Sequence, residues 1–322
     1  MRKIILIIIP FIFVKAESDL SQLLEKYHFV ASKWLMDKSD VIDRYLSDSD
    51  DDKNLSNTKV SIAYELGVNS KGRFSNDVDF SLSLSLPRFS NKVKLTLEKV
   101  NTYRSLIDSK ESRLSNSESK ISSNDDQYNL ALKFSQWSGK KSSIYFTGGV
   151  RFNSKFLLEP YIGFVSGYSI EDTKKIVFNV KNTFRYYLAG EVKDNLSTQY
   201  LYNYKDDILL GWLGNIEYTN KSSHQTLTSE FIWQKVTNSY KFYRVGFVAD
   251  AKLKNFKHLR KNDLYVYVKY HNRYRDKDWL FYEITPSLEW RRRDNYHTSF
   301  GLKFKIGATF GGIRDLINKA RR

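Results

Sequence analysis

The sequence contains no cysteine, and it has only five histidines among 322 residues. The lack of cysteine excludes disulfides, thiolate catalysis and cysteine metal sites, so the fold must be stabilised by other contacts. No two histidines have the His-x-x-x-His spacing of a metal site, and neither a serine-hydrolase elbow nor a phosphate-binding loop occurs. Most enzyme classes are therefore excluded, and we expect no cofactor.

Long apolar runs are missing after residue 14, because charged or polar residues interrupt every later candidate. A helical inner-membrane protein is therefore excluded. Before that point, Arg2 and Lys3 precede an apolar run of 11 residues, and Ala16 provides a small residue for cleavage. This pattern predicts a secretory signal peptide at residues 1–16. An uncleaved anchor is the alternative, but a membrane-spanning helix needs roughly 20 apolar residues.

The chain is basic, with a formal net charge of +16. Removing Arg2, Lys3 and Lys15 with the signal peptide leaves 52 − 3 = 49 basic residues against 36 acidic ones, a net charge of +13. Such a balance suggests nucleic acid as a partner. However, the basic residues are spread through alternating segments, and an exported protein does not meet nucleic acid. We therefore expect no nucleic-acid partner.

Residues 17–57 are expected to form a helical segment followed by a linker. Apolar residues recur at helical spacing over residues 19–46, as at Leu20, Leu23 and Leu24, which favours one or two amphipathic helices. The acidic run at residues 47–53 predicts a solvated linker. It lacks the glycine and the terminal glutamate of a helix-loop-helix calcium site, so calcium binding is the weaker interpretation.

From residue 59 onward, apolar and polar residues alternate with a period of two, as where Val78 and Phe80 flank Asp79. This pattern is typical of β-strands with one apolar and one polar face. About 14 strands are predicted, with 12 and 16 as the neighbouring alternatives. They lie near residues 59–68, 77–86, 91–100, 127–137, 142–152, 156–168, 175–188, 193–203, 207–218, 224–236, 240–253, 262–273, 279–291 and 296–310.

The unbroken row of long strands favours an up-and-down antiparallel β-barrel in a membrane over a soluble sandwich. Most of the strands reach the roughly 9 to 11 residues that cross a bilayer. In such a barrel the apolar faces contact lipid and the polar faces line the lumen. Aromatic residues make up 15% of the chain, and many lie towards strand ends, as expected for interfacial girdles. We therefore predict a transmembrane barrel over residues 58–310.

The gaps between predicted strands indicate an orientation. The gaps after even-numbered strands are all tight, whereas those after odd-numbered strands include the two longest, residues 101–126 and 254–261. Barrels with both termini in the periplasm have short periplasmic turns and longer outer loops. We therefore expect both termini in the periplasm and the loop at residues 101–126 outside.

Two segments carry a resemblance to a known group of proteins. These are Leu86-Pro87-Arg88-Phe89-Ser90-Asn91-Lys92-Val93-Lys94-Leu95 and Asp278-Trp279-Leu280-Phe281-Tyr282-Glu283-Ile284-Thr285-Pro286. There the chain resembles uncharacterised proteobacterial outer-membrane β-barrel proteins, and the similarity spans most of the mature chain. The resemblance implies a periplasmic N-terminal helix followed by a barrel, and it implies no activity.

The end of the chain departs from the usual pattern of outer-membrane barrels, which commonly finish on an aromatic residue of the last strand. Here Phe310 is followed by residues 311–322, which are expected to form a basic periplasmic tail. This tail puts assembly through the usual C-terminal signal in doubt.

One segment, Tyr296-His297-Thr298-Ser299-Phe300-Gly301, is similar to the His-x-Ser-Asn-Gly pattern of outer-membrane phospholipase. In that pattern the histidine activates the serine hydroxyl as a nucleophile. Phe300 occupies the position of the asparagine, and the alternation places His297 and Ser299 on the polar face. A polar pair near the mouth of the lumen is the preferred interpretation, with a lipid hydrolase as the alternative.

The polar faces of the strands supply candidate lumen charges. Glu65 and Glu159 belong to this set, and opposite charges on adjacent strands are expected to pair, notably Glu283 and Glu289 with Lys303 and Lys305. A lumen braced by ion pairs is the first interpretation, and a charged water-filled pore is the second. The principal candidates are Arg151, Lys181, Arg185, Glu217, Glu230, Lys269, Arg273, Glu283, Glu289, Lys303 and Lys305.

Together these patterns predict a monomeric outer-membrane barrel of a Gram-negative bacterium, with a structural role or a narrow passive pore. The alternatives are the hydrolase and an assembly or export component whose N-terminal helix docks a periplasmic partner. The expected partners are outer-membrane lipid, the barrel-assembly machinery and that periplasmic partner.

Overall fold

The computed structural model describes residues 19–47, 58–86, 93–99, 127–138, 141–153, 158–172, 175–221, 224–238, 240–254, 258–274 and 277–311. Several predicted segments lie outside these residues. They are the signal peptide at 1–16, nearly all of the acidic linker, the loop at 101–126, and the C-terminal tail apart from residue 311.

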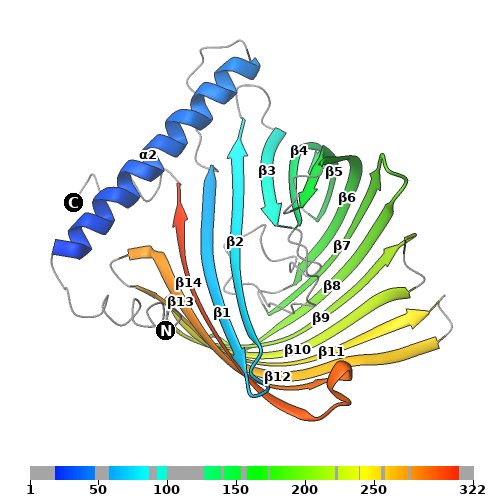
Figure 1. Cartoon of the computed structure of the whole chain (residues 1–322). Coiled ribbons are helices and arrows are strands. Elements are labelled where there is room, and N and C mark those ends of the chain that lie inside the picture. The colour runs from blue at the N-terminus through cyan, green and yellow to red at the C-terminus, as the bar shows by residue number, and fades with distance from the viewer. Residues whose placement is uncertain are drawn as a thin grey trace.

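The predicted barrel is confirmed: 14 antiparallel strands close on themselves, and β1 pairs with β14 (Figure 1). Each of the other strands pairs with its neighbours in sequence. The strands are β1 (Lys59–Asn69), β2 (Phe74–Ser85), β3 (Val93–Lys99), β4 (Gln127–Ser138), β5 (Ser142–Asn153), β6 (Leu158–Asp172), β7 (Ile176–Tyr187), β8 (Val192–Lys205), β9 (Ile208–Thr219), β10 (His224–Asn238), β11 (Lys241–Lys254), β12 (His258–Tyr274), β13 (Lys277–Arg291) and β14 (Thr298–Phe310).

The period-two alternation explains which side chains face out. At the seam between β1 and β14, the apolar residues Ile62 and Ile306 are 41% and 38% exposed. On the other face of the same strands, Glu65 and Lys305 are only 4% and 7% exposed. Apolar residues outside and charged residues inside are the reverse of a soluble β-sandwich, and they suit a barrel in lipid.

Strand β12 begins earlier than its alternation predicts, at His258 instead of residue 262. The pairing of β12 with β11 shifts at this point, because Asp250 pairs with Asp263 whereas Ala251 pairs with Lys261. The bulge interrupts the alternation here, so the pattern of apolar and polar residues did not predict this part of the strand. The predicted loop at 254–261 is therefore mostly strand.

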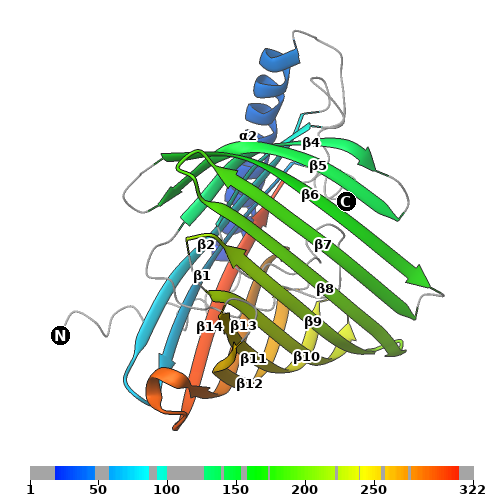
Figure 2. The same ribbon diagram turned by 90° about the vertical axis from the view of Figure 1, so that its right-hand side faces the viewer.

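A single 29-residue helix, α2 (Asp19–Ser47), lies across one end of the barrel (Figures 1 and 2). We call this end, where β1 begins and β14 ends, the α2 end, and the opposite end the far end. His28 Nε2 hydrogen-bonds the Thr309 carbonyl oxygen at 2.9 Å, and the His28 ring stacks on Trp279 with centroids 4.2 Å apart. Ser39 Oγ lies 3.1 Å from Thr58 Oγ1, just before β1. The helix is thus fixed to the ends of strands from both termini.

Among the described residues, no helix is both long enough and apolar enough to cross a membrane.

Candidate functional site: the charged lumen

Acidic side chains on the inner face of β1, β2 and β13 are neutralised by cations on β12 and β14. Lys305 Nζ lies 2.7 Å from Asp79 Oδ2, and Lys303 Nζ lies 3.3 Å from Glu65 Oε1. Glu283 contacts Lys269 Nζ at 3.4 Å. These groups are mostly buried, so each ion pair compensates the desolvation of its members. We call this side of the lumen the braced wall.

Glu283 also has a histidine partner. His271 Nδ1 lies 2.9 Å from Glu283 Oε1, and the His271 ring stacks on Phe242 with centroids 4.7 Å apart. Glu283 therefore has partners for both carboxylate oxygens. This arrangement fixes the carboxylate and the imidazole in one geometry inside the wall.

The braced wall continues onto β10 and β11 with large side chains. Glu230, which is fully buried, accepts a hydrogen bond from the Tyr267 hydroxyl. Arg244 Nη2 and Nε donate to Gln234 Oε1 at 2.8 and 3.0 Å. A cavity of about 60 Å³ remains beside these residues, with Lys269 and Glu283 in its lining. That volume suits a few water molecules, so this side is filled mostly by side chains.

The opposite side of the lumen carries a row of basic residues. Pairing places Lys94 on β3 beside Lys133 on β4, and Arg185 on β7 beside Lys193 on β8. Two strands lie between these pairs, and the same register continues through Thr147 and Gly163. We call Lys94, Lys133, Arg185 and Lys193 the basic row. Lys94 is exposed and the other three are partly exposed, so the row is accessible from the lumen.

The basic row extends from the α2 end of the barrel to the far end. Lys94 lies next to the first residue of β3, at the α2 end, whereas Lys193 lies next to the first residue of β8, at the far end. This follows from the tilt of barrel strands, which makes residues in one register step along the barrel axis. An anion that passed from one cation of the row to the next would therefore travel along the barrel axis.

At the far end, several cations converge on Glu191, which lies in the turn between β7 and β8. Arg151 Nη2 donates to Glu191 Oε2 at 2.5 Å, and Lys193 and Lys221 each lie 3.6 Å from the same carboxylate. Burial alone would raise the pKa of Glu191, but the hydrogen bond from Arg151 and the lysine charges hold this pKa below its usual value. Arg151 also contacts Glu159 on β6.

The other predicted lumen residues are Arg185, which belongs to the basic row, and Lys181, Glu217 and Arg273. Lys181 is partly exposed, with Gly167 and Ser197 as its register partners. The Arg185 guanidinium lies 5.8 Å from the centroid of the Tyr161 ring. Glu217 is partly exposed, and its Oε2 atom is buried without a hydrogen-bond partner. Arg273 is exposed near the α2 end.

In the register of β13 and β14, one predicted acid lies opposite a lysine and the other does not. Glu283 lies opposite Lys305 in the register, but Glu289 lies opposite Ser299. Glu289 pairs instead with Arg291 of its own strand at 2.7 Å. Residues two apart face the same side of a strand, so this pairing needs no neighbour.

Sequence reasoning also missed several inward charges. The period-two signal was present for most of them, since Lys133 stands between Leu132 and Phe134 and Arg244 between Tyr243 and Val245. It was absent for Glu191, which lies in the turn between β7 and β8. The missed charges that the structure places on the inner face or its rim include Asp77, Asp79, Lys94, Lys133, Glu191, Lys193, Arg244 and Asp250.

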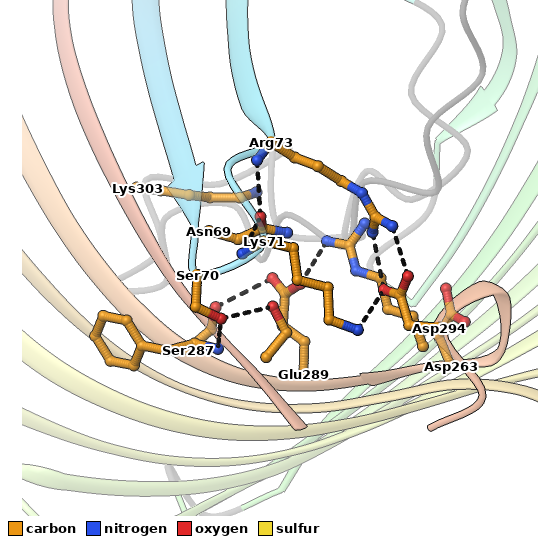
Figure 3. Close-up of polar contacts among 12 residues, drawn as sticks. Asn69, Ser70, Lys71, Arg73, Asp263, Ser287, Glu289, Asp294 and Lys303 are labelled. Carbon is orange, nitrogen blue, oxygen red and sulfur yellow. Dashed lines mark hydrogen bonds and ion pairs between the residues drawn. The ribbon is translucent and has the colours of Figure 1, made fainter. Parts of the chain in front are cut away.

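At the far end, polar contacts join the turn between β1 and β2 to the connection between β13 and β14 (Figure 3). Arg73, in the β1–β2 turn, donates to both carboxylate oxygens of Asp294, at 2.8 and 2.5 Å. These hydrogen bonds hold the pKa of Asp294 well below its usual range. Lys71 lies 3.4 Å from the same carboxylate. The turn is thereby tied to the connection between β13 and β14.

The hydrolase alternative rests on His297 and Ser299, which the structure does not bring together. Ser299 is 1% exposed, and its hydroxyl lies 3.3 Å from Ser70 Oγ. His297 precedes β14 and is exposed. Within the part of the chain that the structure describes, no hydrogen bond joins these two side chains. The base needed to activate a serine nucleophile is thus out of place.

This geometry makes a prediction about lipid hydrolysis. Purified protein in mixed micelles with calcium should release no fatty acid from phospholipid, because Ser299 is buried without a base. Fatty-acid release can be followed by titration, with Ser299→Ala as the matched variant. Release that disappears in Ser299→Ala would contradict this expectation and establish the hydrolase.

A closed antiparallel barrel with an apolar outer surface and a charged lumen defines an integral outer-membrane β-barrel protein. Neither protein-family models nor curated proteins match this chain.

Solved structures of outer-membrane proteins share the barrel at low sequence identity. A loop L8 deletion form of OmpT, an outer membrane protein of Vibrio cholerae, is 8% identical with a TM-score of 0.46, over 79% of this chain and 98% of that one. The CymD monoaromatic hydrocarbon channel is 8% identical with a TM-score of 0.45, over 79% and 87%. The KdgM porin, in complex with disordered oligogalacturonate, is 10% identical with a TM-score of 0.35, over 78% and 98%.

Proposed function

We propose that this protein is a narrow, passive outer-membrane pore that prefers anions. The observation that carries the proposal is the unequal distribution of lumen charge. The carboxylates Asp79, Glu65 and Glu283 of the braced wall each have a cationic partner. The basic row on the other side brings four cations onto one line of the inner wall, with Glu191 beside Lys193. An ion inside the barrel feels these nearby charges strongly, because low-dielectric walls focus their field.

The glycines on the inner face of β5 and β6 support a path beside the basic row. The inner face of β5 and β6 includes the small residues Thr147, Gly149, Gly163 and Gly167 alongside Tyr145, Tyr161 and Val165. On the braced wall the corresponding face carries large residues such as Tyr267 and Arg244. Water and ions therefore have more room along β5 and β6, and the conductance should be small because the rest of the lumen is filled.

The proposal includes how the protein is exported, how it is oriented in the membrane and which partners it meets. Residues 1–16 direct export, the α2 end faces the periplasm, and the far end faces outward. The barrel-assembly machinery inserts the chain as a monomer, and α2 remains available to a periplasmic partner. The tight gap of residues 206–207 between β8 and β9, at the α2 end, supports this orientation, because periplasmic turns are short.

Conductance in planar lipid bilayers tests the pore. The wild-type protein should form small channels with an anion-to-cation permeability ratio above 1, read from the reversal potential in a salt gradient. The double substitution Lys181→Gln with Arg185→Gln should move this ratio towards 1, because it removes two inward cations. Lys241→Gln, an exposed cation on the outer face at the start of β11, should leave the ratio unchanged.

Large, cation-selective conductance steps would contradict both a lumen filled by ion-paired side chains and a net positive charge along the path. A complete absence of channels from correctly folded protein would reject the pore and leave a structural or docking role.

A further inference from the structure

We propose that one face of α2 inserts into the membrane leaflet that surrounds the α2 end of the barrel. Six large apolar residues form this face, and we call them the apolar stripe. They are Leu23, Tyr27, Val30, Trp34, Val41 and Tyr45, all of them exposed. The stripe takes no part in the proposed pore, and the partner that we infer for it is a lipid surface.

The stripe lies on the side of the helix that faces away from the barrel. At 3.6 residues per turn, its six members lie within about 60° of one another around the helix axis. The residues Ser32, Leu35 and Ser39 are buried against the barrel and lie about 140° around the helix from the stripe. Ser32 Oγ accepts a hydrogen bond from the Gly311 amide at 3.2 Å. The contacts that fix α2 to the barrel therefore leave the stripe exposed.

The helix lies along the rim of the α2 end, outside the opening of the barrel. Figure 1 shows α2 beside the ring of strands, along the ends of β14, β1 and β2. In the view turned by 90°, one end of α2 extends beyond the strands (Figure 2). The outer faces of β1 and β14 carry exposed apolar residues such as Ile62 and Ile306, which suit contact with lipid. A helix in this position lies next to the lipid around the barrel.

Tyrosines on the outer face mark the headgroup level at the same end. Tyr243 and Tyr274 are each 44% exposed, and the rings of Tyr274 and Tyr282 lie with centroids 5.9 Å apart. Such amphipathic rings are typical of the interface between lipid and water. The helix is fixed to the same strand as Tyr282, because His28 stacks on Trp279 of β13. The stripe is therefore held near the level of the lipid headgroups.

The borders of the stripe also suit a lipid surface. Helices that lie in a membrane interface combine aromatic and aliphatic residues on one face with lysine or arginine on the polar side. Lys26 and Lys33 lie on one border of the stripe and Lys38 on the other, all exposed. Asp37 is also exposed at the border, which leaves an excess of positive charge. The lysine ammonium groups can reach headgroup phosphates while their methylene chains cover the stripe. Protein–protein interfaces are depleted in lysine, so these borders favour lipid over a protein partner.

Fluorescence quenching in vesicles tests this inference, and the lack of cysteine allows a single label in each variant. Leu23→Cys and Val41→Cys place a fluorophore on the stripe, whereas Gln22→Cys and Lys33→Cys are controls at exposed positions off the stripe. Each labelled full-length protein is refolded at low density into vesicles of phosphatidylcholine and phosphatidylglycerol. Lipids with a nitroxide on the acyl chain should quench the stripe labels about threefold more than the control labels. Iodide on both sides of the bilayer should quench the stripe labels about threefold less.

Three outcomes would overturn the inference. If iodide quenched the stripe labels as strongly as the control labels, the stripe would face water and remain open to a periplasmic protein. If the nitroxide lipids quenched both sets of labels equally, the stripe would have no special contact with lipid. Protection from iodide that appeared only at high protein density, with energy transfer between labelled copies, would assign the stripe to a second copy of the chain. Circular dichroism checks that each variant is folded, and none of these measurements depends on conduction.

Discussion

Phe304→Arg should severely impair folding of the barrel into lipid vesicles. Phe304 lies on the outer face of β14, between Leu66 of β1 and Ile284 of β13. An arginine on the lipid face near the middle of the bilayer costs about 2–4 kcal/mol. Since whole domains are stable by only about 5–15 kcal/mol, this loss is a large share of the total. Urea titration of the refolded protein in vesicles, followed by tryptophan fluorescence, measures the effect.

The matched variant is Lys303→Gln, one residue earlier on the inner face. Lys303 contacts Glu65 at 3.3 Å, and glutamine can still hydrogen-bond this carboxylate, so a milder loss is expected. Equal losses in the two variants would show that the assigned facing of β14 is wrong.

Glu283→Ala should be the most damaging change on the lumen side. Glu283 is 5% exposed, and it balances Lys269, which is 3% exposed, and hydrogen-bonds His271. Removing one partner of a buried ion pair typically costs about 3–5 kcal/mol, because the other charge remains buried without compensation. The free energy of unfolding in vesicles should fall by an amount of this order.

A double variant separates loss of charge balance from loss of packing. Adding Lys269→Met to Glu283→Ala removes the uncompensated cation and should recover a large part of the lost stability. No recovery in the double variant would mean that Glu283 acts through His271 or through packing, and that the ion pair with Lys269 contributes little.

The two sides of the lumen differ in what they can do. On the braced wall, three lysines form ion pairs that stabilise the barrel: Lys305 with Asp79, Lys303 with Glu65 and Lys269 with Glu283. On β3–β8 the basic row lies beside small residues, such as Gly149 and Gly163, and large ones, such as Tyr145 and Tyr161. Under the proposed pore, substitutions in the basic row should change ion selectivity with less effect on folding than substitutions in the braced wall.

Alternation along the chain by itself determined the number of strands and which residues face the lumen. A period of two assigns each side chain to one face, and a closed barrel buries the polar face. Facing predicted in this way placed Lys303 and Lys305 inside and Phe304 outside, as the register shows. Alternation did not predict the strand at residues 258–261, because the pairing of β12 with β11 shifts by one residue at a bulge there.

Only the tertiary structure decided which inward residues meet. Lys305 reaches Asp79 because β14 closes on β1 and β2 follows, a contact between residues 226 positions apart. The basic row exists because five successive registers, from β3 to β8, bring Lys94, Lys133, Arg185 and Lys193 onto one line. If the pairing of two of these strands shifted by two residues, every side chain would keep its face of the sheet, but the four cations would no longer lie on one line. Facing depends on local sequence, whereas neighbourhood depends on strand register, which the turns, the bulges and the closure of the barrel set together.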